Sequence, residues 1–404
     1  MLNFILPRTN IRLYEDISYK HTDKKFPIIG TRNIYIDNIN EQINKPQSNW
    51  DIMSQIYYPY EFIGNVMQTY PHEEQFDNSN HFFSLRYAMH LELHHFIKHD
   101  ILYMNNETKT LVFYSDDKYN LNCMNYLKNN NNKNICIKYD STNIKKILSK
   151  NSSSIDHIVI GSHSDDDNEV DYARISYISV LYALCFQKFN GSSIIKLYDI
   201  DTPLSIGILG ILSSMYLEVH LVKPVTSKSD SSEIFVVCKK FLHKNSNLFY
   251  KKFMNIIQNL TKIKVVPDRV AVCTFKNQNN FDLVDAKSSK SKIPELHSAE
   301  NLNFKIDYQY GILQREAINL QLMNRINEIS IIFYQRRLEY IHTLLNTSHL
   351  LQTHVNENST KVNATIKNNI HKCLEWTSKY YKPIIFSSEI NAIVLHRLYN
   401  RIDI

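Results

Sequence analysis

Short apolar segments alternate with helical segments between residues 110 and 238, and this alternation limits the possible folds more than any other feature of the chain. The candidate strands lie at residues 110–114, 135–139, 155–160, 193–198, 218–223 and 233–238. Helical patterns lie between them at about residues 121–128, 144–150, 170–189 and 203–215. Strands and helices in this order predict an α/β fold, in which a mostly parallel sheet is covered by helices on both faces.

The segments on either side of this region have different patterns. Residues 1–80 are rich in Asn, Tyr, Pro and charged residues, and we expect an irregular N-terminal extension there. An amphipathic helix is expected at residues 81–100, and the α/β domain is placed at residues 81–245. Longer helical periods follow, notably at residues 312–345, which predicts a mainly helical C-terminal region at residues 246–404.

The composition is that of a folded, globular protein. Hydrophobic residues make up 43% and charged residues 21% of the 404 residues, which excludes a wholly disordered chain or a coiled coil. No segment approaches the ~20 uninterrupted apolar residues of a membrane span. The first residues lack the basic and long apolar segments of a signal peptide. We therefore expect a cytoplasmic protein without a membrane partner, and its net charge of +6 permits a polyanionic one.

Cysteine and histidine patterns do not predict a metal site. The six cysteines are scattered without a CxxC pair, so neither a zinc site nor a disulfide framework is expected. His90 and His94, like His95 and His99, lie four residues apart on the expected helix, which would place each pair on one face. No third ligand or HExxH-type glutamate accompanies them. We expect partly exposed histidines and no bound metal.

One lysine and one glutamate lie in positions that α/β enzymes use for chemistry. Lys196 lies inside an apolar strand segment, where burial of an ammonium is costly unless it has a partner or a function. Glu233 lies at the beginning of another apolar strand. Both are expected at one edge of the sheet, where such folds assemble their sites. A structural ion pair is the alternative interpretation, and the spacing alone does not separate the two.

The segment around Glu233 resembles a known enzyme family. The run KPVTSKSDSSEIFVVCKKF at residues 223–241 follows IIKLYD and a long helix that ends at Asn190 and Gly191. Over about residues 81–245 the chain resembles the FtsJ-like ribose 2′-O-methyltransferases, and most closely those of large cytoplasmic DNA viruses such as African swine fever virus and the poxviruses. The resemblance implies a Rossmann-like core that takes a methyl group from S-adenosylmethionine and places it on a ribose 2′-hydroxyl, typically in capped mRNA.

The resemblance also implies catalytic residues. Family members use a Lys-Asp-Lys-Glu tetrad, in which a lysine of lowered pKa deprotonates the hydroxyl. Lys196 matches the third member and Glu233 the fourth. Met89 stands where the family has its first lysine, and Ser162 where it has the aspartate. Asp165, Asp166 and Asp167 follow a few residues downstream, and one of them, with Asp165 as our candidate, could replace that aspartate. A solvated turn is the alternative interpretation of this run.

The expected cofactor loop also departs from the family pattern. Family members have a glycine-rich turn after the first strand, whereas residues 115–119 of this chain read SDDKY. Asp116 or Asp117 is a candidate for binding the amino group of S-adenosylmethionine. Asp140, after the second strand, is a candidate for binding its ribose hydroxyls. A turn-forming aspartate is the alternative interpretation of Asp140.

Besides RNA binding without chemistry, these matches and departures leave two functions open. The first is an RNA 2′-O-methyltransferase that acts on capped mRNA. The second is a catalytically silent subunit with the methyltransferase fold, which binds or stimulates an RNA-capping or transcription protein. For a viral member, the expected location is the host cytoplasm or the virion.

Overall fold

The computed structural model describes a little under half of the chain. The described residues are 1–9, 17–20, 58–69, 85–98, 108–114, 134–138, 153–161, 169–197, 200, 203–229, 231–245, 251, 253–255, 311–313, 319–353 and 355–380. All statements on structure below concern these residues.

Seven strands of the described residues form one sheet in the order β1-β7-β8-β6-β5-β3-β4. Their bounds are β1 (Leu2–Ile5), β3 (Thr110–Tyr114), β4 (Asn134–Lys138), β5 (Ile155–Ile160), β6 (Gln187–Leu197), β7 (Tyr216–Lys223) and β8 (Ile234–Phe241). A second, two-stranded sheet pairs β2 (Ile17–Lys20) with β9 (Gly311–Leu313).

The main sheet is mixed, and five of its seven strands, β3 to β7, run in one direction. Strands β4, β3, β5 and β6 are parallel, but β8 is antiparallel to both β6 and β7, and β1 is antiparallel to β7. The reason is the short connection at residues 224–233, which is too short for a parallel crossover and therefore reverses the chain. Strand β8 lies between β6 and β7, and Glu233, the residue before β8, therefore lies at the end of β6.

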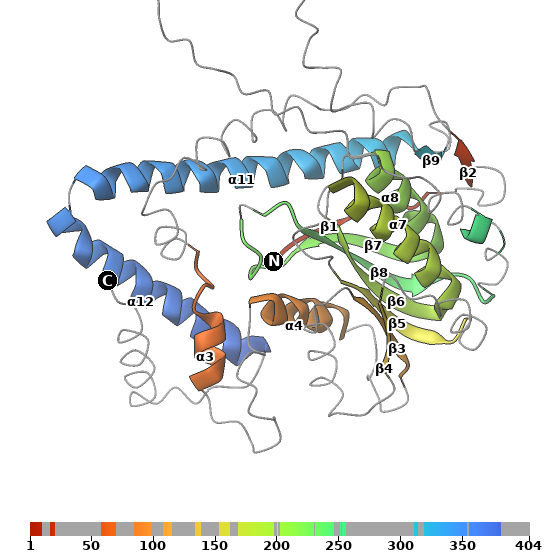
Figure 1. The fold of residues 1–404 in the computed structure, drawn as a ribbon, viewed down its shortest axis with the longest axis horizontal. Helices are drawn as coiled ribbons and strands as arrows, with labels where there is room; N and C mark the ends of the chain where they lie inside the picture. The colour runs from red at the N-terminus through yellow and green to blue at the C-terminus, as the bar shows by residue number, and fades with distance from the viewer. Residues whose placement is uncertain are drawn as a thin grey trace, which may run out of the picture.

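Helices cover both faces of this sheet, as Figure 1 shows. Side chains of successive strand residues point to opposite faces. Ile195 and Val236 pack with α7 (Glu169–Phe186) and α8 (Pro203–Met215), whereas Ile194 and Phe235 pack under α4 (Leu85–Lys98). The strands are apolar on both faces because both faces are buried.

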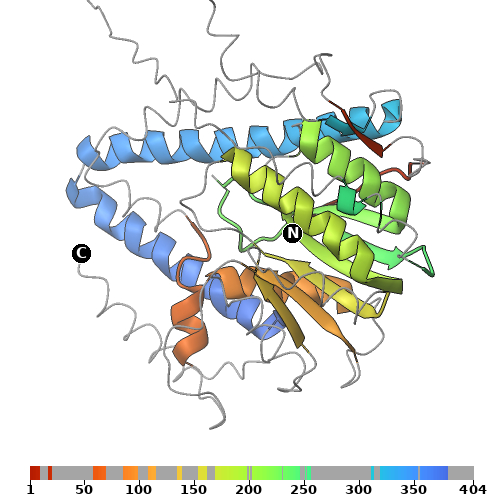
Figure 2. The same ribbon diagram turned by 45° about the vertical axis from the view of Figure 1, so that its right-hand side comes forward.

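Two long helices lie beside the sheet. Helix α11 (Leu320–Thr353) begins in the layer of α7 and α8, where Leu322, Ile326 and Ile329 join the core. Helix α12 (Val355–Tyr380) runs back toward α3 (Ile63–Thr69) and α4, as Figure 2 shows from another side. These three helices share a separate apolar cluster that includes Trp376. The proposed division into domains at residues 80 and 245 stays a prediction.

Two segments differ from the expected secondary structure. Part of the segment expected to be irregular is ordered, because β1 forms the edge of the main sheet and α3 packs on α12. The helix expected to end at residue 189 ends at Phe186, and β6 begins at once. A turn in the left-handed region follows at Asn190, with φ 62°. Gly191 is needed after it, because a Cβ would lie 2.7 Å from the carbonyl oxygen of Asp156.

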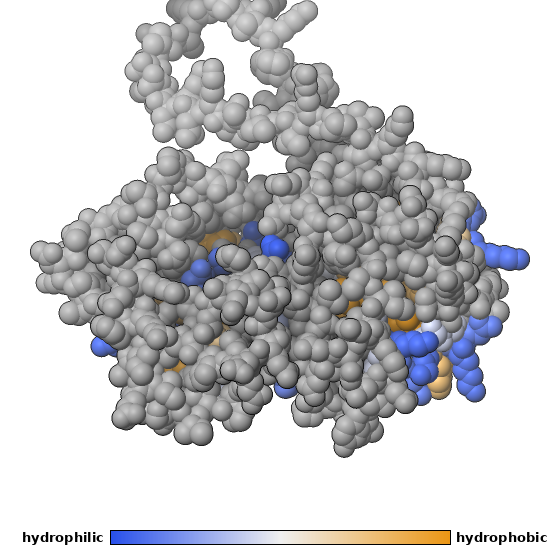
Figure 3. Space-filling model, turned by 60° about the horizontal axis from the view of Figure 1, so that its bottom comes forward, coloured by the Kyte–Doolittle hydropathy of each residue, from blue (hydrophilic) through white to orange (hydrophobic). Residues whose placement is uncertain are grey.

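Figure 3 shows one face of the molecule in space-filling form. Hydrophilic side chains of the described residues gather there on the side of the sheet, and described hydrophobic residues are visible only as small, separated areas. Among the described residues no helix is long and apolar enough to cross a membrane.

Candidate active site

The structure brings Lys196 and Glu233 into direct contact. Lys196 is the next-to-last residue of β6, and Glu233 immediately precedes β8. The antiparallel register, which pairs Lys196 with Phe235 and Leu197 with Ile234, brings Glu233 to the end of β6. The Lys196 Nζ lies 2.8 Å from Glu233 Oε2, and both side chains are at least nine-tenths buried. The buried ammonium therefore has the carboxylate partner that its burial requires.

The surroundings of Glu233 keep its carboxylate ionised. Burial by itself raises the pKa of this carboxyl group, but the charge of Lys196 and hydrogen bonds from Lys196 and Ser227 outweigh it and hold the pKa below its ordinary value. The Ser227 hydroxyl donates to Oε1 at 2.9 Å, while Lys196 occupies Oε2. Both carboxylate oxygens thus have a partner, which fixes the orientation of the pair.

The loop between β7 and β8, residues 224–233, is held from three sides. Glu92 on α4 is fully buried and accepts hydrogen bonds from the Val225 amide at 3.0 Å and the Thr226 hydroxyl at 3.1 Å. The indole of Trp376 on α12 donates to the same carboxylate at 3.4 Å. The Tyr58 hydroxyl donates to the Thr226 carbonyl. Because Ser227 is the next residue, these contacts position the group that orients Glu233.

His90 and Met89 lie on the covered face beside the ion pair. The ring of His90 packs edge-on against Phe235, with centroids 5.7 Å apart, and Phe235 is the cross-strand partner of Lys196. Residues directly opposite in an antiparallel pair share a face, so His90 and Lys196 lie on the same side of the sheet. Met89 is buried among apolar residues that include Ile194. Its thioether supplies packing and no positive charge at the position where the family has a lysine.

Two of the helix histidines are buried, so the expectation of partly exposed side chains is wrong for them. His90 and His94 are 4% and 1% exposed. Helix α4 packs against the sheet on one side and against α3 and α12 on the other, which buries most of its circumference. Burial, assisted by the charge of Lys196, lowers the pKa of His90 to about 3. No group of three metal-ligating side chains occurs among the described residues.

The remaining predicted residues lie outside the part of the chain that the structure describes. These are the tetrad candidates Asp165 and Ser162 and the cofactor candidates Asp116, Asp117 and Asp140. The strands from which they follow are described: β3, β4 and β5 are parallel and end at one edge. Ligands of open α/β sheets bind beyond the carboxyl ends of parallel strands. A ligand of the parallel part of this sheet is therefore expected beyond the ends of β3, β4 and β5.

Sequence reasoning did not identify Glu92 or Ser227 as functional residues. Glu92 follows Met89 by three residues, as a glutamate follows the lysine in the family pattern, and Ser227 belongs to the KPVTSK run. Both residues therefore occupy motif positions in the sequence. Their contacts could not be predicted, because the partners of Glu92 are distant in sequence and Ser227 lies in a loop. The structure adds the physical reason for both residues, because one holds the loop and the other holds Glu233.

Comparison with known proteins finds relatives that match part of the chain. The chain is similar over part of its length to cap-specific mRNA 2′-O-methyltransferases of animals. No protein-family model matches the chain.

Three relatives illustrate the extent of the similarity. Cap-specific mRNA (nucleoside-2′-O-)-methyltransferase 1A of Caenorhabditis briggsae is 34% identical over 150 residues, which are 37% of this chain and 15% of the relative. Cap-specific mRNA (nucleoside-2′-O-)-methyltransferase 1 of Caenorhabditis elegans is 29% identical over 24% of this chain and 10% of its own length. The inactive cap-specific methyltransferase 1B of C. briggsae is 37% identical over 18% of this chain and 8% of its own length. The matches therefore span about a sixth or less of these relatives.

Proposed function

We propose that this chain is an RNA-cap ribose 2′-O-methyltransferase that uses S-adenosylmethionine. The observation that carries the proposal is the buried Lys196–Glu233 pair at the sheet edge, 2.8 Å apart and oriented by Ser227. The partial similarity to cap-specific mRNA 2′-O-methyltransferases supports it. Deprotonation of a ribose hydroxyl requires a base, such as a lysine, and a group that holds this base in place, such as a glutamate.

The proposed reaction assigns a separate function to each side chain. S-adenosylmethionine, when bound near Asp116, Asp117 and Asp140, supplies the electrophilic methyl group. Lys196, once its ammonium has released a proton to solvent, would accept the proton of the 2′-hydroxyl as that oxygen takes the methyl group, whose bond to the sulfonium sulfur breaks so that S-adenosylhomocysteine leaves. Glu233, held by Ser227, keeps the Nζ of Lys196 in place and stabilises the ammonium that results.

Two observations favour a second candidate, a catalytically silent subunit that binds an RNA-capping or transcription protein. The position of the first family lysine is occupied by Met89, which is buried in an apolar cluster. One relative carries the description inactive. In this second candidate the Lys196–Glu233 pair has a structural function only, as a neutralised pair in the sheet.

The two candidates differ in cofactor binding and in methyl transfer. Calorimetric titration of the purified chain with S-adenosylmethionine and S-adenosylhomocysteine measures the first, and transfer of labelled methyl groups to capped RNA measures the second. The methyltransferase candidate predicts micromolar cofactor binding and transfer that falls at least a hundredfold in Lys196→Ala. Lys188→Ala, an exposed lysine on the same strand, is the matched control and should keep full activity.

Loss of activity in Lys196→Ala must be separated from loss of folding, because an unpartnered buried Glu233 is destabilising. The double variant Lys196→Met with Glu233→Leu removes both charges and should melt closer to the wild type while it stays inactive. Absence of cofactor binding up to millimolar concentration, together with absence of transfer, would establish the silent subunit instead.

The proposed origin and location rest on the motif resemblance. A chain of a large cytoplasmic DNA virus would act on mRNA in the host cytoplasm or inside the virion. Immunofluorescence of infected or transfected cells tests this part of the proposal, and accumulation in the nucleus would contradict it.

A further inference from the structure

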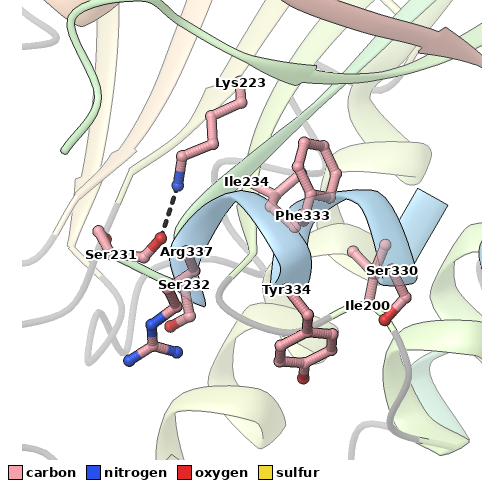
Figure 4. A pocket seen from close by; sticks show the side chains of 9 residues that line it. All are labelled: Ile200, Lys223, Ser231, Ser232, Ile234, Ser330, Phe333, Tyr334 and Arg337. Carbon is pink, nitrogen blue, oxygen red and sulfur yellow. Dashed lines mark hydrogen bonds between the residues drawn. The ribbon is translucent and has the colours of Figure 1, made fainter. Parts of the chain in front are cut away.

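A small pocket lies between helix α11 and the residues that flank Glu233 at the ends of β7 and β8. Figure 4 shows the side chains that line it. They are Ile200, Lys223, Ser231, Ser232, Ile234, Ser330, Phe333, Tyr334 and Arg337. Among the described residues, the lining thus combines two cations with several hydroxyl groups and includes no acidic side chain.

Arg337 is the cation with unused hydrogen-bonding capacity. It lies half-buried on α11, and its buried Nε has no hydrogen-bond partner among the described residues. Burial of a guanidinium donor without an acceptor costs free energy. Such a donor is explained by an anion that binds there, because a guanidinium holds phosphate or carboxylate oxygens through two parallel hydrogen bonds.

The pocket shares its backbone with the candidate active site. Ser231 and Ser232 immediately precede Glu233. The Nζ of Lys223 donates to the carbonyl oxygens of Ser231 at 2.5 Å and Glu233 at 3.2 Å, and Figure 4 draws the first of these bonds. An anion in the pocket would therefore contact the same loop that carries Glu233.

We propose that this pocket binds a backbone phosphate of the RNA strand whose ribose hydroxyl reaches Lys196. The identity of the strand rests on the proposed function, whereas the anion site rests on the pocket itself. A phosphate next to the reacting ribose is covalently linked to it, which fits a site directly adjoining Glu233. The ring of Tyr334 in the same lining fits single-stranded RNA, which is bound by cations together with aromatic side chains.

The test compares two neighbouring arginines of α11. Arg337→Gln removes the pocket cation, and Arg336→Gln removes an exposed cation of the same helix with the same change in net charge. Binding of a short capped RNA is measured by fluorescence anisotropy over a range of salt concentrations. We expect Arg337→Gln to weaken binding about tenfold at low salt and to reduce the slope of log K against log salt by about 0.7, the value for one phosphate of a single strand. Arg336→Gln should change neither quantity.

Each result has a distinct meaning. Equal effects of the two substitutions, at equal melting temperatures, would overturn the proposal. A polyglutamate peptide of the same charge that binds as tightly as the RNA, with the same dependence on Arg337, would also overturn it and identify a protein ligand.

Failure of the proposed function gives a different pattern. RNA binding that depends on Arg337 without methyl transfer refutes the enzyme and leaves the phosphate site. Methyl transfer with equal RNA affinity in both variants refutes the phosphate site and leaves the enzyme.

Discussion

His90 and Glu233 both lie near Lys196, and burial acts on them in opposite directions. Burial favours the neutral form of each group, but only Glu233 has charged and hydrogen-bonding partners that overcome it. The candidate site therefore contains one fixed ion pair and one neutral imidazole. The ionised state of Glu233 is due to its partners, and the neutral state of His90 is due to its burial. Neither state could be predicted from the residue type alone.

The neutral state of His90 predicts a pH-dependent stability. Its pKa of about 3 lies far below the value near 6.5 of an unfolded imidazole, so acidification from pH 6.5 to 4.5 protonates the unfolded state first. The free energy of unfolding should then fall by about 1.4 kcal/mol per pH unit from this residue, and it should be independent of His90 above pH 7. Urea denaturation of His90→Leu measures the effect.

The variant should therefore gain stability relative to the wild type as the pH falls from 6.5 to 4.5. His371→Leu, at an exposed position on α12, is the control and should leave the pH dependence unchanged. A stability difference between His90→Leu and the wild type that stays constant over this range would show that His90 titrates normally in the folded protein.

At the scale of elements, the conformation of the loop at residues 224–233 is held by side chains of α4 and α12. Glu92 accepts three hydrogen bonds from two different elements, and burial raises the pKa of its carboxyl group despite these donors. A buried acceptor with three donors is costly to remove, because every donor is left without a partner.

The consequence for activity can be measured separately from the consequence for folding. Glu92→Ala should destabilise the protein by about 2 kcal/mol or more, since Val225, Thr226 and Trp376 lose their acceptor. Below the melting temperature it should also lower kcat while KM for RNA stays nearly constant, because Ser227 no longer orients Glu233. Glu92→Gln keeps one acceptor oxygen and should recover part of the lost kcat. Equal activity of the alanine variant and the wild type would exclude a positioning function.

At the scale of the whole molecule, the first nine residues connect the main sheet with the helices that cover it. They form the edge strand β1 and then contact α8. Strand β1 pairs with β7, Leu6 donates its amide to Val219 at 2.8 Å, and the Thr9 hydroxyl donates to the Gly210 carbonyl of α8 at 2.9 Å. Leu6 is 3% exposed and belongs to the main core. The segment thus covers β7 and makes β1 the edge strand of the sheet.

Two adjacent substitutions test this contribution. Leu6→Ala should lower the free energy of unfolding by about 2–4 kcal/mol, as expected when a buried leucine is truncated. Ile5→Ala is the control, because Ile5 is 56% exposed and its truncation should cost less than about 0.5 kcal/mol. Chemical denaturation measures both, and similar losses would mean that Leu6 does not pack in the core.

The sequence predicted local features well and long-range ones poorly. Strands β3 and β5 have the bounds predicted from their apolar runs, because each run is buried on both faces and ends in polar residues. Strand β1 was missed, because four residues give little periodicity and its partner β7 is more than 200 residues away. Strand β8 is antiparallel because a short loop precedes it. The position of β8 between β6 and β7 could not be predicted from that loop, because it depends on strands that are distant in sequence.

The candidate site shows the same limit. Lys196 and Glu233 were identified from motif positions, and the distance between them required the register of β6 and β8. The contacts of Glu92 were not predictable, because Trp376 is distant in sequence and only the tertiary fold brings it to α4.

The anchoring of the 224–233 loop also has a consequence for synthesis of the protein. Its supports include Tyr58 and Glu92 from early in the chain and Trp376 from the last described helix, α12. A ribosome adds residues in order, at about 5–20 per second, so Glu233 is made well before α12 can fold against Glu92. The ion pair therefore reaches its final geometry only after α12 has been translated, and products truncated before α12 lack a complete site.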